Sequence, residues 1–141
     1  MAIVYFDSSA FVKLVVEEDG SDLAAALWDG CDAAVSSRLA YPEVRAALAA
    51  AGRAHRLDRV DQGRATAAWE DFWLATRVVE LTELVATRAG QLANQHALRG
   101  ADAVHLASLL AVGATETLFA VWDERLRAGA KAAGVQLAPL G

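Results

Sequence analysis

The sequence has little of what stabilises secreted proteins, spans membranes or breaks helices. It contains one cysteine, Cys31, so no disulfide forms within the chain and the fold does not depend on an oxidising compartment. No apolar run approaches the ~18 residues of a membrane span, and no basic signal segment precedes Asp7. Two prolines in 141 residues leave few helix breakers. We therefore expect a cytoplasmic protein without a membrane-spanning segment.

An excess of positive charge is also missing. The net charge of −5 argues against a protein that coats duplex DNA with a broad basic surface. It does not exclude a nuclease, because a carboxylate site lowers the net charge by itself and its metal ions restore positive charge locally. The chain is instead rich in hydrophobic residues, 55% of the total, which suffices for one core. Without a repeat or a linker, we expect a single domain over residues 1–141.

Short apolar segments alternate with longer helical ones along the chain. The expected strands are 2–6, 33–36, 78–81, 118–122 and, less marked, 135–137. The expected helices are 8–17, 21–28, 38–51, 58–75, 83–97, 101–111 and a short one before Gly134. This alternation predicts parallel βαβ units, and hence an α/β fold of three layers (α/β/α) around a mostly parallel sheet of four to five strands.

Four carboxylates stand where such a fold places its chemistry. Asp7 ends the first strand and Asp123 the fourth, and sites in open α/β sheets form beyond the carboxyl ends of strands. Glu43 and Asp102 lie near helix N-termini inside otherwise apolar segments. Structural roles are the alternative: Asp123 as a helix cap, Asp102 complementing a helix dipole, and Glu43 pairing with Arg45 or another arginine nearby. Asp7 fits such a role less well, because an unpaired carboxylate at the end of an apolar strand is costly.

One arrangement explains all four carboxylates together. Mg²⁺, or Mn²⁺, prefers hard oxygen ligands and keeps several waters, so a few Asp and Glu side chains and a phosphate oxygen complete its shell. The metal offsets the repulsion between the carboxylates, polarises a phosphodiester and lowers the pKa of a bound water. No protein nucleophile is needed. The sequence thus predicts a catalytic metal site formed by Asp7, Glu43, Asp102 and Asp123.

Four segments carry a resemblance to a known family. They are 5–14 (YFDSSAFVKL), 42–48 (PEVRAAL), 98–107 (LRGADAVHLA) and 121–126 (VWDERL). In this order, over nearly the whole chain, they resemble the motifs of PIN-domain ribonucleases, and in particular the VapC-type toxins of toxin–antitoxin systems. One motif alone is weak, whereas four in order are specific. Trp122 departs from the pattern, which has a small or hydroxyl residue before the last aspartate.

The resemblance implies a function and a set of partners. It implies a metal-dependent endoribonuclease that hydrolyses RNA phosphodiester bonds, acts as the toxin of a toxin–antitoxin pair, forms homodimers and binds a small protein antitoxin. It assigns the metal first to Asp7 and Asp102. Glu43 and Asp123 then complete the pocket, directly or through waters.

Other residues have candidate roles near this site. Ser8 and Ser9 are both candidates to hydrogen-bond the Asp7 carboxylate or a water, and the sequence does not choose between them. His105 can share a helix face with Asp102. We interpret it as a packed or supporting histidine rather than a ligand, because a hard-oxygen site does not favour imidazole. Lys13 is expected to pair with a carboxylate.

Arginines gather in the second helical hairpin of an otherwise acidic chain. They are Arg38, Arg45, Arg53, Arg56, Arg59 and Arg64. We interpret Arg53, Arg56 and Arg59 as an arm that binds RNA phosphates, the alternative being a solvated helix face with local ion pairs. Trp69 and Trp73, four residues apart, are expected in the core or on a dimer surface rather than as a platform for stacking bases.

Two other functions compete with this interpretation. A phosphoaspartate phosphatase of the haloacid-dehalogenase type needs a second aspartate where Ser9 stands, and a receiver-type switch needs an acidic neighbour of Asp7. Both requirements fail. A non-catalytic PIN-like binding module would keep the fold without cleaving RNA. The presence of all four carboxylates argues against it.

Overall fold

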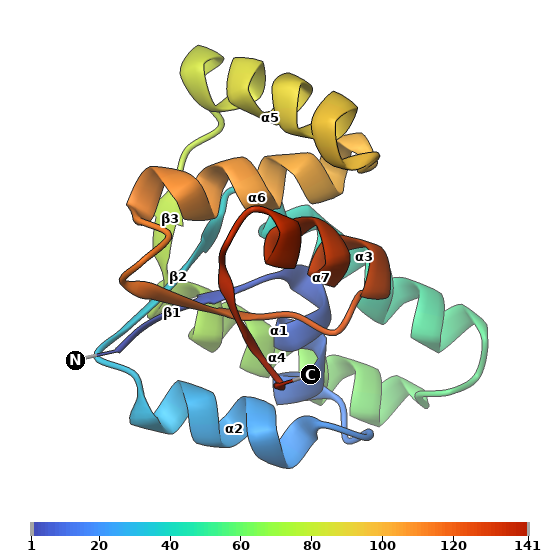
Figure 1. The fold of residues 1–141 in the computed structure, drawn as a ribbon. Coiled ribbons are helices and arrows are strands. Elements are labelled where there is room, and N and C mark those ends of the chain that lie inside the picture. Colours follow the sequence, from blue (N-terminus) through green and yellow to red (C-terminus); the bar gives the residue numbers. More distant parts are fainter. Residues whose placement is uncertain (1, 141) are drawn as a thin grey trace.

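Five parallel strands form the centre of the molecule in a computed structural model that describes residues 2–140 (Figure 1). The strands are β1 (Ile3–Phe6), β2 (Ala33–Ser37), β3 (Arg77–Val79), β4 (Thr117–Ala120) and β5 (Gln136–Ala138). Their order across the sheet is β3-β2-β1-β4-β5, and every neighbouring pair is parallel. The predicted α/β sheet is therefore confirmed, with its fifth strand present.

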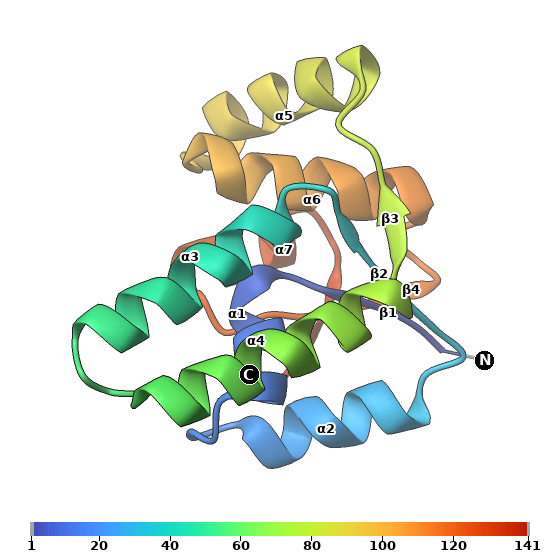
Figure 2. The same ribbon diagram turned by 180° about the vertical axis from the view of Figure 1, so that it is seen from behind.

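The sheet separates two groups of helices. The helices are α1 (Ser8–Val15), α2 (Ser21–Gly30), α3 (Ala40–Arg53), α4 (Arg59–Leu74), α5 (Glu83–His96), α6 (Gly100–Val112) and α7 (Glu124–Ala132). Successive strand residues point to opposite faces, so Val4 and Phe6 pack with α1–α4, whereas Tyr5 packs with α5–α7. Figures 1 and 2 show the two groups on either side of the sheet. The predicted three layers are confirmed.

Most expected element boundaries agree with the structure to within two residues. The expected helix from residue 38 begins at Ala40, because the Arg38 N–H still donates to Val79 O at 3.0 Å at the end of the sheet. The strand expected over 78–81 ends at Val79, since Glu80 turns outward to the Arg38 guanidinium. Trp69 on α4 is fully buried against Phe11 of α1 and Tyr41 of α3, which confirms its place in the core. No helix within residues 2–140 has the length and apolar character needed to cross a bilayer.

The strand order locates the functional edge. The sheet grows from β1 toward β2 and β3 on one side, and through β4 toward β5 on the other. Ligands of open α/β sheets bind at such a reversal, outside the carboxyl ends of the strands. Asp7 follows β1 and Asp123 lies just beyond β4, so both stand at this point. The order also differs from the 2-1-3-4-5 order of receiver domains, which removes that competing interpretation.

Candidate active site

Asp7 is held by both the strand it follows and the helix it precedes. It is the N-cap of α1 and is only 3% exposed. Its Oδ1 accepts hydrogen bonds from the Ala10 N–H at 3.0 Å and the Ser9 hydroxyl at 2.6 Å. Of the two candidate serines, Ser9 is thus the one that binds this carboxylate, and Ser8 makes no hydrogen bond to it within the described part of the chain.

The environment of Asp7 disfavours its charge. Burial raises the pKa of Asp7 to about 6, and the nearby Glu43 carboxylate adds to the rise. His105, the Ser9 hydroxyl and the Ala10 N–H act in the opposite direction and only partly offset the burial. A cation beside Asp7 would remove the remaining penalty on its charged form.

Glu43 is paired with histidine rather than with arginine. It lies in the first turn of α3, and its Oε1 is 2.6 Å from Nε2 of His105, which is 2% exposed. Arg45 does not take this role, because its guanidinium contacts Glu70 at 3.1 Å. His105 is thus a packed histidine that supports a candidate ligand, as interpreted from the sequence. The second imidazole nitrogen, Nδ1, is 2.8 Å from the Tyr5 hydroxyl.

Asp102 and Asp123 share one arginine. Arg99, the N-cap of α6, places its Nε 3.1 Å from Asp102 Oδ2 and its Nη2 3.3 Å from Asp123 Oδ2. The two carboxylates hold the pKa of the Arg99 guanidinium above its usual value. Sequence reasoning missed Arg99, although its place three residues before Asp102, at a helix start, was the available signal. Asp123 also caps α7 through Oδ1, which accepts from the Leu126 N–H at 2.9 Å.

Three of the four carboxylates keep an oxygen that the protein does not use. Within residues 2–140, no hydrogen bond reaches Asp7 Oδ2, Glu43 Oε2 or Asp102 Oδ1. None of them is among the fully buried side-chain atoms without a partner, so each retains contact with solvent. Hard carboxylate oxygens open to solvent suit a hydrated divalent cation. The donor set therefore fits Mg²⁺ or Mn²⁺.

The side chains do not yet surround a common point. Among the described residues, no three His, Cys, Asp or Glu side chains converge closely enough to hold a metal ion as they stand. Arg99 lies across Asp102 and Asp123 with 63% of its side chain exposed. A cation entering between these two carboxylates would have to displace the guanidinium, and the exposure of Arg99 leaves it room to turn toward solvent.

Trp122, the residue that departs from the family pattern, lies beside α1 and α2. Its backbone N–H donates to Ser9 Oγ at 3.1 Å, which ties the segment after β4 to the cap of Asp7. Its ring lies 5.3 Å from Lys13 Nζ and so close to Gly20 that a Cβ there would stand 2.8 Å from the indole nitrogen. Lys13 pairs with Glu18 at 3.1 Å, which confirms the expected carboxylate partner.

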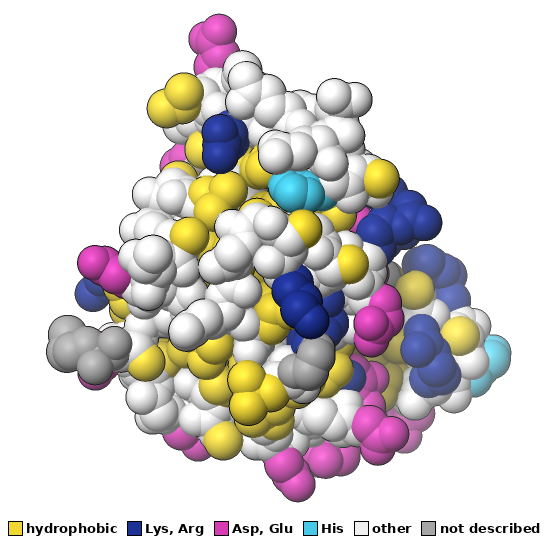
Figure 3. All heavy atoms as spheres, viewed as in Figure 1, with side chains coloured by type: hydrophobic (Ala, Val, Ile, Leu, Met, Phe, Trp, Pro, Cys, Tyr) yellow, Lys and Arg dark blue, Asp and Glu magenta, His cyan; other side chains and the backbone are white. Residues whose placement is uncertain are grey.

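The arginine-rich hairpin divides into paired and unpaired members. Arg38 pairs with Glu80 at 2.6 Å, and Arg45 pairs with Glu70. Arg53, Arg56 and Arg59 are exposed at the corner between α3 and α4 and make no ion pair with any residue from 2 to 140. Figure 3 shows Lys and Arg side chains gathered on the lobe that this corner forms. The exposed Arg64 on α4 likewise has no ion pair in the described part of the chain, so four of the six arginines of this hairpin are unpaired.

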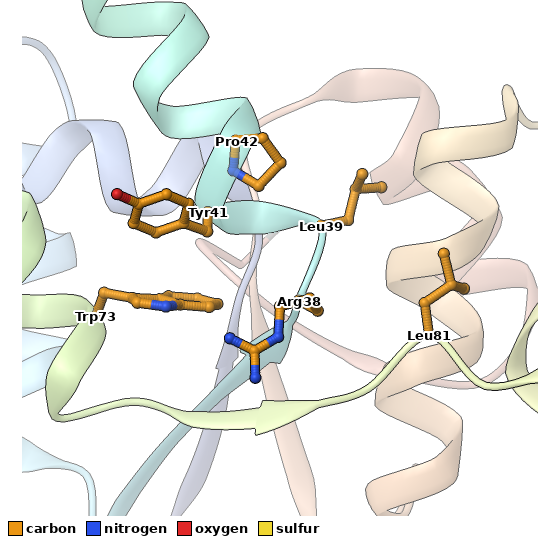
Figure 4. A pocket seen from close by; sticks show the side chains of 6 residues that line it. All are labelled: Arg38, Leu39, Tyr41, Pro42, Trp73 and Leu81. Atoms are coloured by element: carbon orange, nitrogen blue, oxygen red, sulfur yellow. The ribbon is translucent and has the colours of Figure 1, made fainter.

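An apolar hollow of about 470 Å³ lies beside the start of α3 (Figure 4). Its lining is Arg38, Leu39, Tyr41, Pro42, Trp73 and Leu81. The Arg38 guanidinium stands 5.9 Å from the Trp73 ring. Trp73 is partly exposed at this surface, whereas Trp69 is buried. Leu81 is half exposed at the edge of this hollow. Carboxylates do not line it, which separates it from the candidate active site.

Comparison with known proteins identifies the class to which this fold and site belong. A family model described as the PIN domain matches residues 4–132, which is most of the chain. Ribonuclease VapC49 of Mycobacterium tuberculosis (strain ATCC 25618 / H37Rv) is 66% identical over 139 residues, with 99% of this chain and 96% of the relative covered. Ribonuclease VapC45 of strain CDC 1551 / Oshkosh matches with the same identity and coverage. The chain belongs to the PIN-domain family and, within it, to the VapC proteins.

Solved structures agree with this fold. The crystal structure of Mycobacterium tuberculosis VapC20, described as a toxin that cleaves the sarcin–ricin loop, superposes with a TM-score of 0.68 at 18% identity and covers 94% of this chain and 95% of its own. A toxin–antitoxin complex from Klebsiella pneumoniae superposes with a TM-score of 0.57 at 17% identity, covering 86% and 85%. At these identities the structures support the fold alone.

The raised pKa of Asp7 predicts that replacing it by asparagine stabilises the fold by an amount that depends on pH. In the metal-free protein the folded state favours neutral Asp7, so this stabilisation is full below the unfolded pKa of about 4 and lost as the pH rises through about 6. Asp7→Asn should therefore raise the free energy of unfolding by on the order of 3 kcal/mol near pH 7.5 and change it little near pH 3.5. Urea unfolding in EDTA at both pH values measures this.

Asp58→Asn is the matched control for this measurement. Asp58 is also a helix N-cap whose Oδ1 accepts a backbone N–H, at 2.7 Å, but it is exposed. Asp58→Asn should therefore give no comparable rise in the free energy of unfolding near pH 7.5. An Asp7→Asn protein that is equally stabilised at both pH values, or destabilised near pH 7.5, would contradict the assigned cause.

Proposed function

We propose that this VapC protein is a metal-dependent endoribonuclease that hydrolyses RNA phosphodiester bonds and acts as the toxin of a toxin–antitoxin pair. The observation that carries the proposal is buried Asp7 at the point where the strand order reverses, with Glu43 near enough to raise its pKa and with Arg99 joining Asp102 to Asp123. Its VapC relatives in Mycobacterium tuberculosis carry the name ribonuclease. The four-motif order found in the sequence supports the same assignment.

Each carboxylate has a defined part in this proposal. Asp7 and Asp102 would hold Mg²⁺ or Mn²⁺ through their unused oxygens, and Glu43 and Asp123 would complete the site directly or through waters. The bound metal supplies a polarised phosphodiester and a water of lowered pKa. The protein fixes the carboxylates: Ser9 and the Ala10 N–H hold Asp7, and the Leu126 N–H holds Asp123.

Metal dependence is the first consequence to test. EDTA should abolish cleavage of RNA, and added Mg²⁺ or Mn²⁺ should restore it. Asp7→Asn and Asp102→Asn should each lower the cleavage rate by about 100-fold or more, while the fold is kept, because each removes a ligand charge. Asp29→Asn, an exposed aspartate of α2, is the control and should cleave as the parent does.

This assay also separates the proposal from the main alternative. Full activity in EDTA would refute the metal mechanism. A non-catalytic PIN-like module would bind RNA without cleaving it under any metal condition. Circular dichroism of each variant distinguishes a lost ligand from a lost fold.

RNA is proposed to approach over the corner between α3 and α4. Arg53, Arg56 and Arg59 are free to bind phosphates, and each phosphate contact releases counterions and so steepens the salt dependence of binding. Replacing the three by Ala should weaken RNA binding and flatten its dependence on salt concentration. Cleavage of a short substrate at saturation should suffer less. Fluorescence anisotropy across a salt series measures the slope.

A control with the same change in charge shows whether location matters. Arg77, Arg88 and Lys131 are exposed, and their side chains make no ion pair in the described part of the chain. Their triple Ala variant should keep the parental slope. Equal slopes for the two triple variants would show that RNA approaches elsewhere.

Two protein partners are part of this proposal. The toxin–antitoxin complex that superposes on this chain supports a small protein antitoxin as one partner. A second copy of the chain is the other, and the apolar hollow with half-exposed Leu81 at its edge is the surface we assign to this homodimer. A cytoplasmic location accords with RNA as the substrate.

The antitoxin is proposed to act through a cation. Arg99 shows that a guanidinium fits between Asp102 and Asp123, and arginine binds carboxylates with a planar fork that stays charged. We propose a flexible antitoxin tail that places an Arg or Lys against Asp7, Asp102 or Asp123 and thereby competes with metal and RNA. Co-expression with the neighbouring small reading frame should give an inactive complex. Proteolysis of the partner should then restore cleavage.

Two outcomes would contradict the proposed inhibition by the antitoxin tail. Cleavage that is unchanged by the partner would refute inhibition. A structure of the complex with the tail bound far from the carboxylates would refute this form of it.

A further inference from the structure

A line of hydrogen bonds leads from the core into the candidate active site. Tyr5 on β1, His105 on α6 and Glu43 on α3 come from three different elements. The Tyr5 hydroxyl is 2.8 Å from His105 Nδ1, and His105 Nε2 is 2.6 Å from Glu43 Oε1. Tyr5 is fully buried and His105 nearly so. The line therefore has one end sealed in the core and the other at a carboxylate that meets solvent.

The geometry determines which imidazole nitrogen carries the proton toward Glu43. A bare nitrogen lone pair does not approach a carboxylate oxygen to 2.6 Å, so Nε2 must donate to Glu43. In a neutral imidazole the proton on Nε2 leaves Nδ1 as an acceptor. Tyr5 then donates its hydroxyl proton to Nδ1.

Neighbouring hydroxyls do not compete for the donor role. Ser36 donates to the Phe6 carbonyl at 2.6 Å, and Ser108 donates to the Val104 carbonyl at 2.7 Å. Both serines also interact with the Tyr5 hydroxyl, but the single proton of each is used in its carbonyl bond. Because Nδ1 of the neutral imidazole is an acceptor 2.8 Å away, Tyr5 donates to it, and the direction Tyr5 to His105 to Glu43 follows.

We propose that Tyr5 and His105 are positioning residues for the metal site: Tyr5 fixes the tautomer of His105, and His105 then holds Glu43 Oε1 so that Oε2 is presented to the metal. A free glutamate loses much rotamer freedom on binding a metal, whereas one held by a buried donor has lost it already. Hydrogen-bonded partners behind a metal ligand typically change metal affinity by about 10–100-fold. This inference rests on the proposed metal-dependent function.

Metal binding tests the roles without relying on activity. Isothermal titration with Mn²⁺ at one fixed pH should give a Kd raised by about 10–100-fold in His105→Ala. Tyr5→Phe should raise the Kd by about 2- to 10-fold, which is the effect of one hydrogen bond. His105→Gln should restore most of the affinity, because its amide nitrogen lies as many bonds from Cα as Nε2 does.

A double variant separates tautomer control from ordinary packing. An amide N–H donates to Glu43 whatever its neighbour does, so adding Tyr5→Phe to His105→Gln should not weaken Mn²⁺ binding further. Tyr41→Phe is the matched control, because the Tyr41 hydroxyl also donates to a glutamate, Glu70, outside this line. It should leave the Kd unchanged. Thermal melting of each variant checks the fold.

Imidazole ¹⁵N spectra of the metal-free protein give a second readout. The parent and Tyr41→Phe should show His105 protonated at Nε2 with a hydrogen-bonded Nδ1, and Tyr5→Phe should shift the Nδ1 resonance. A parent chain that binds no Mn²⁺ would overturn the proposed function and this inference together. A parent that binds Mn²⁺, with Tyr5→Phe and both His105 variants within twofold of it, would overturn this inference alone.

Discussion

Negative charge is concentrated at the point where the strand order of the sheet reverses, between β1 and β4, and the polar groups around this point compensate for it. Asp7 lies at the end of a buried strand, where removal from water opposes its charge and Glu43 adds repulsion. Three kinds of group offset the negative charge of these carboxylates. Hydroxyl and backbone N–H groups donate to Asp7, and an imidazole lies against Glu43. The guanidinium of Arg99 binds both Asp102 and Asp123.

The fold was predictable because its signals are local and repeated. Apolar runs such as 2–6 end at a polar residue, and helices between them impose parallel pairing, so both layers and strands follow from the sequence. The ends of elements were less predictable. The start of α3 shifts because Arg38 still pairs with β3, and that bond joins residues far apart in the chain.

The sequence predicts a set of residues for the candidate site but few of their contacts. Carboxylates after strands and at helix starts mark Asp7, Glu43, Asp102 and Asp123 as candidates without a structure. Their partners are set by distance in space: Tyr5 meets His105 a hundred residues later, and Ser9 meets the Trp122 backbone. A pattern within one segment cannot give such pairs. The choice of Ser9 over Ser8 likewise depends on which hydroxyl faces the carboxylate of its own turn.

The structural and functional interpretations of these aspartates are compatible. Asp7 and Asp123 are helix caps, as the structural interpretation requires, and in each the capping oxygen is Oδ1. A cap fixes the carboxylate rotamer by one oxygen, which leaves Oδ2 pointing in a defined direction. Oδ2 of Asp7 is unused by the protein, and Oδ2 of Asp123 meets only the exposed Arg99. The bonds that begin α1 and α7 therefore also orient two candidate ligand oxygens, so stability of the helix ends and order in the proposed metal site would depend on the same carboxylates.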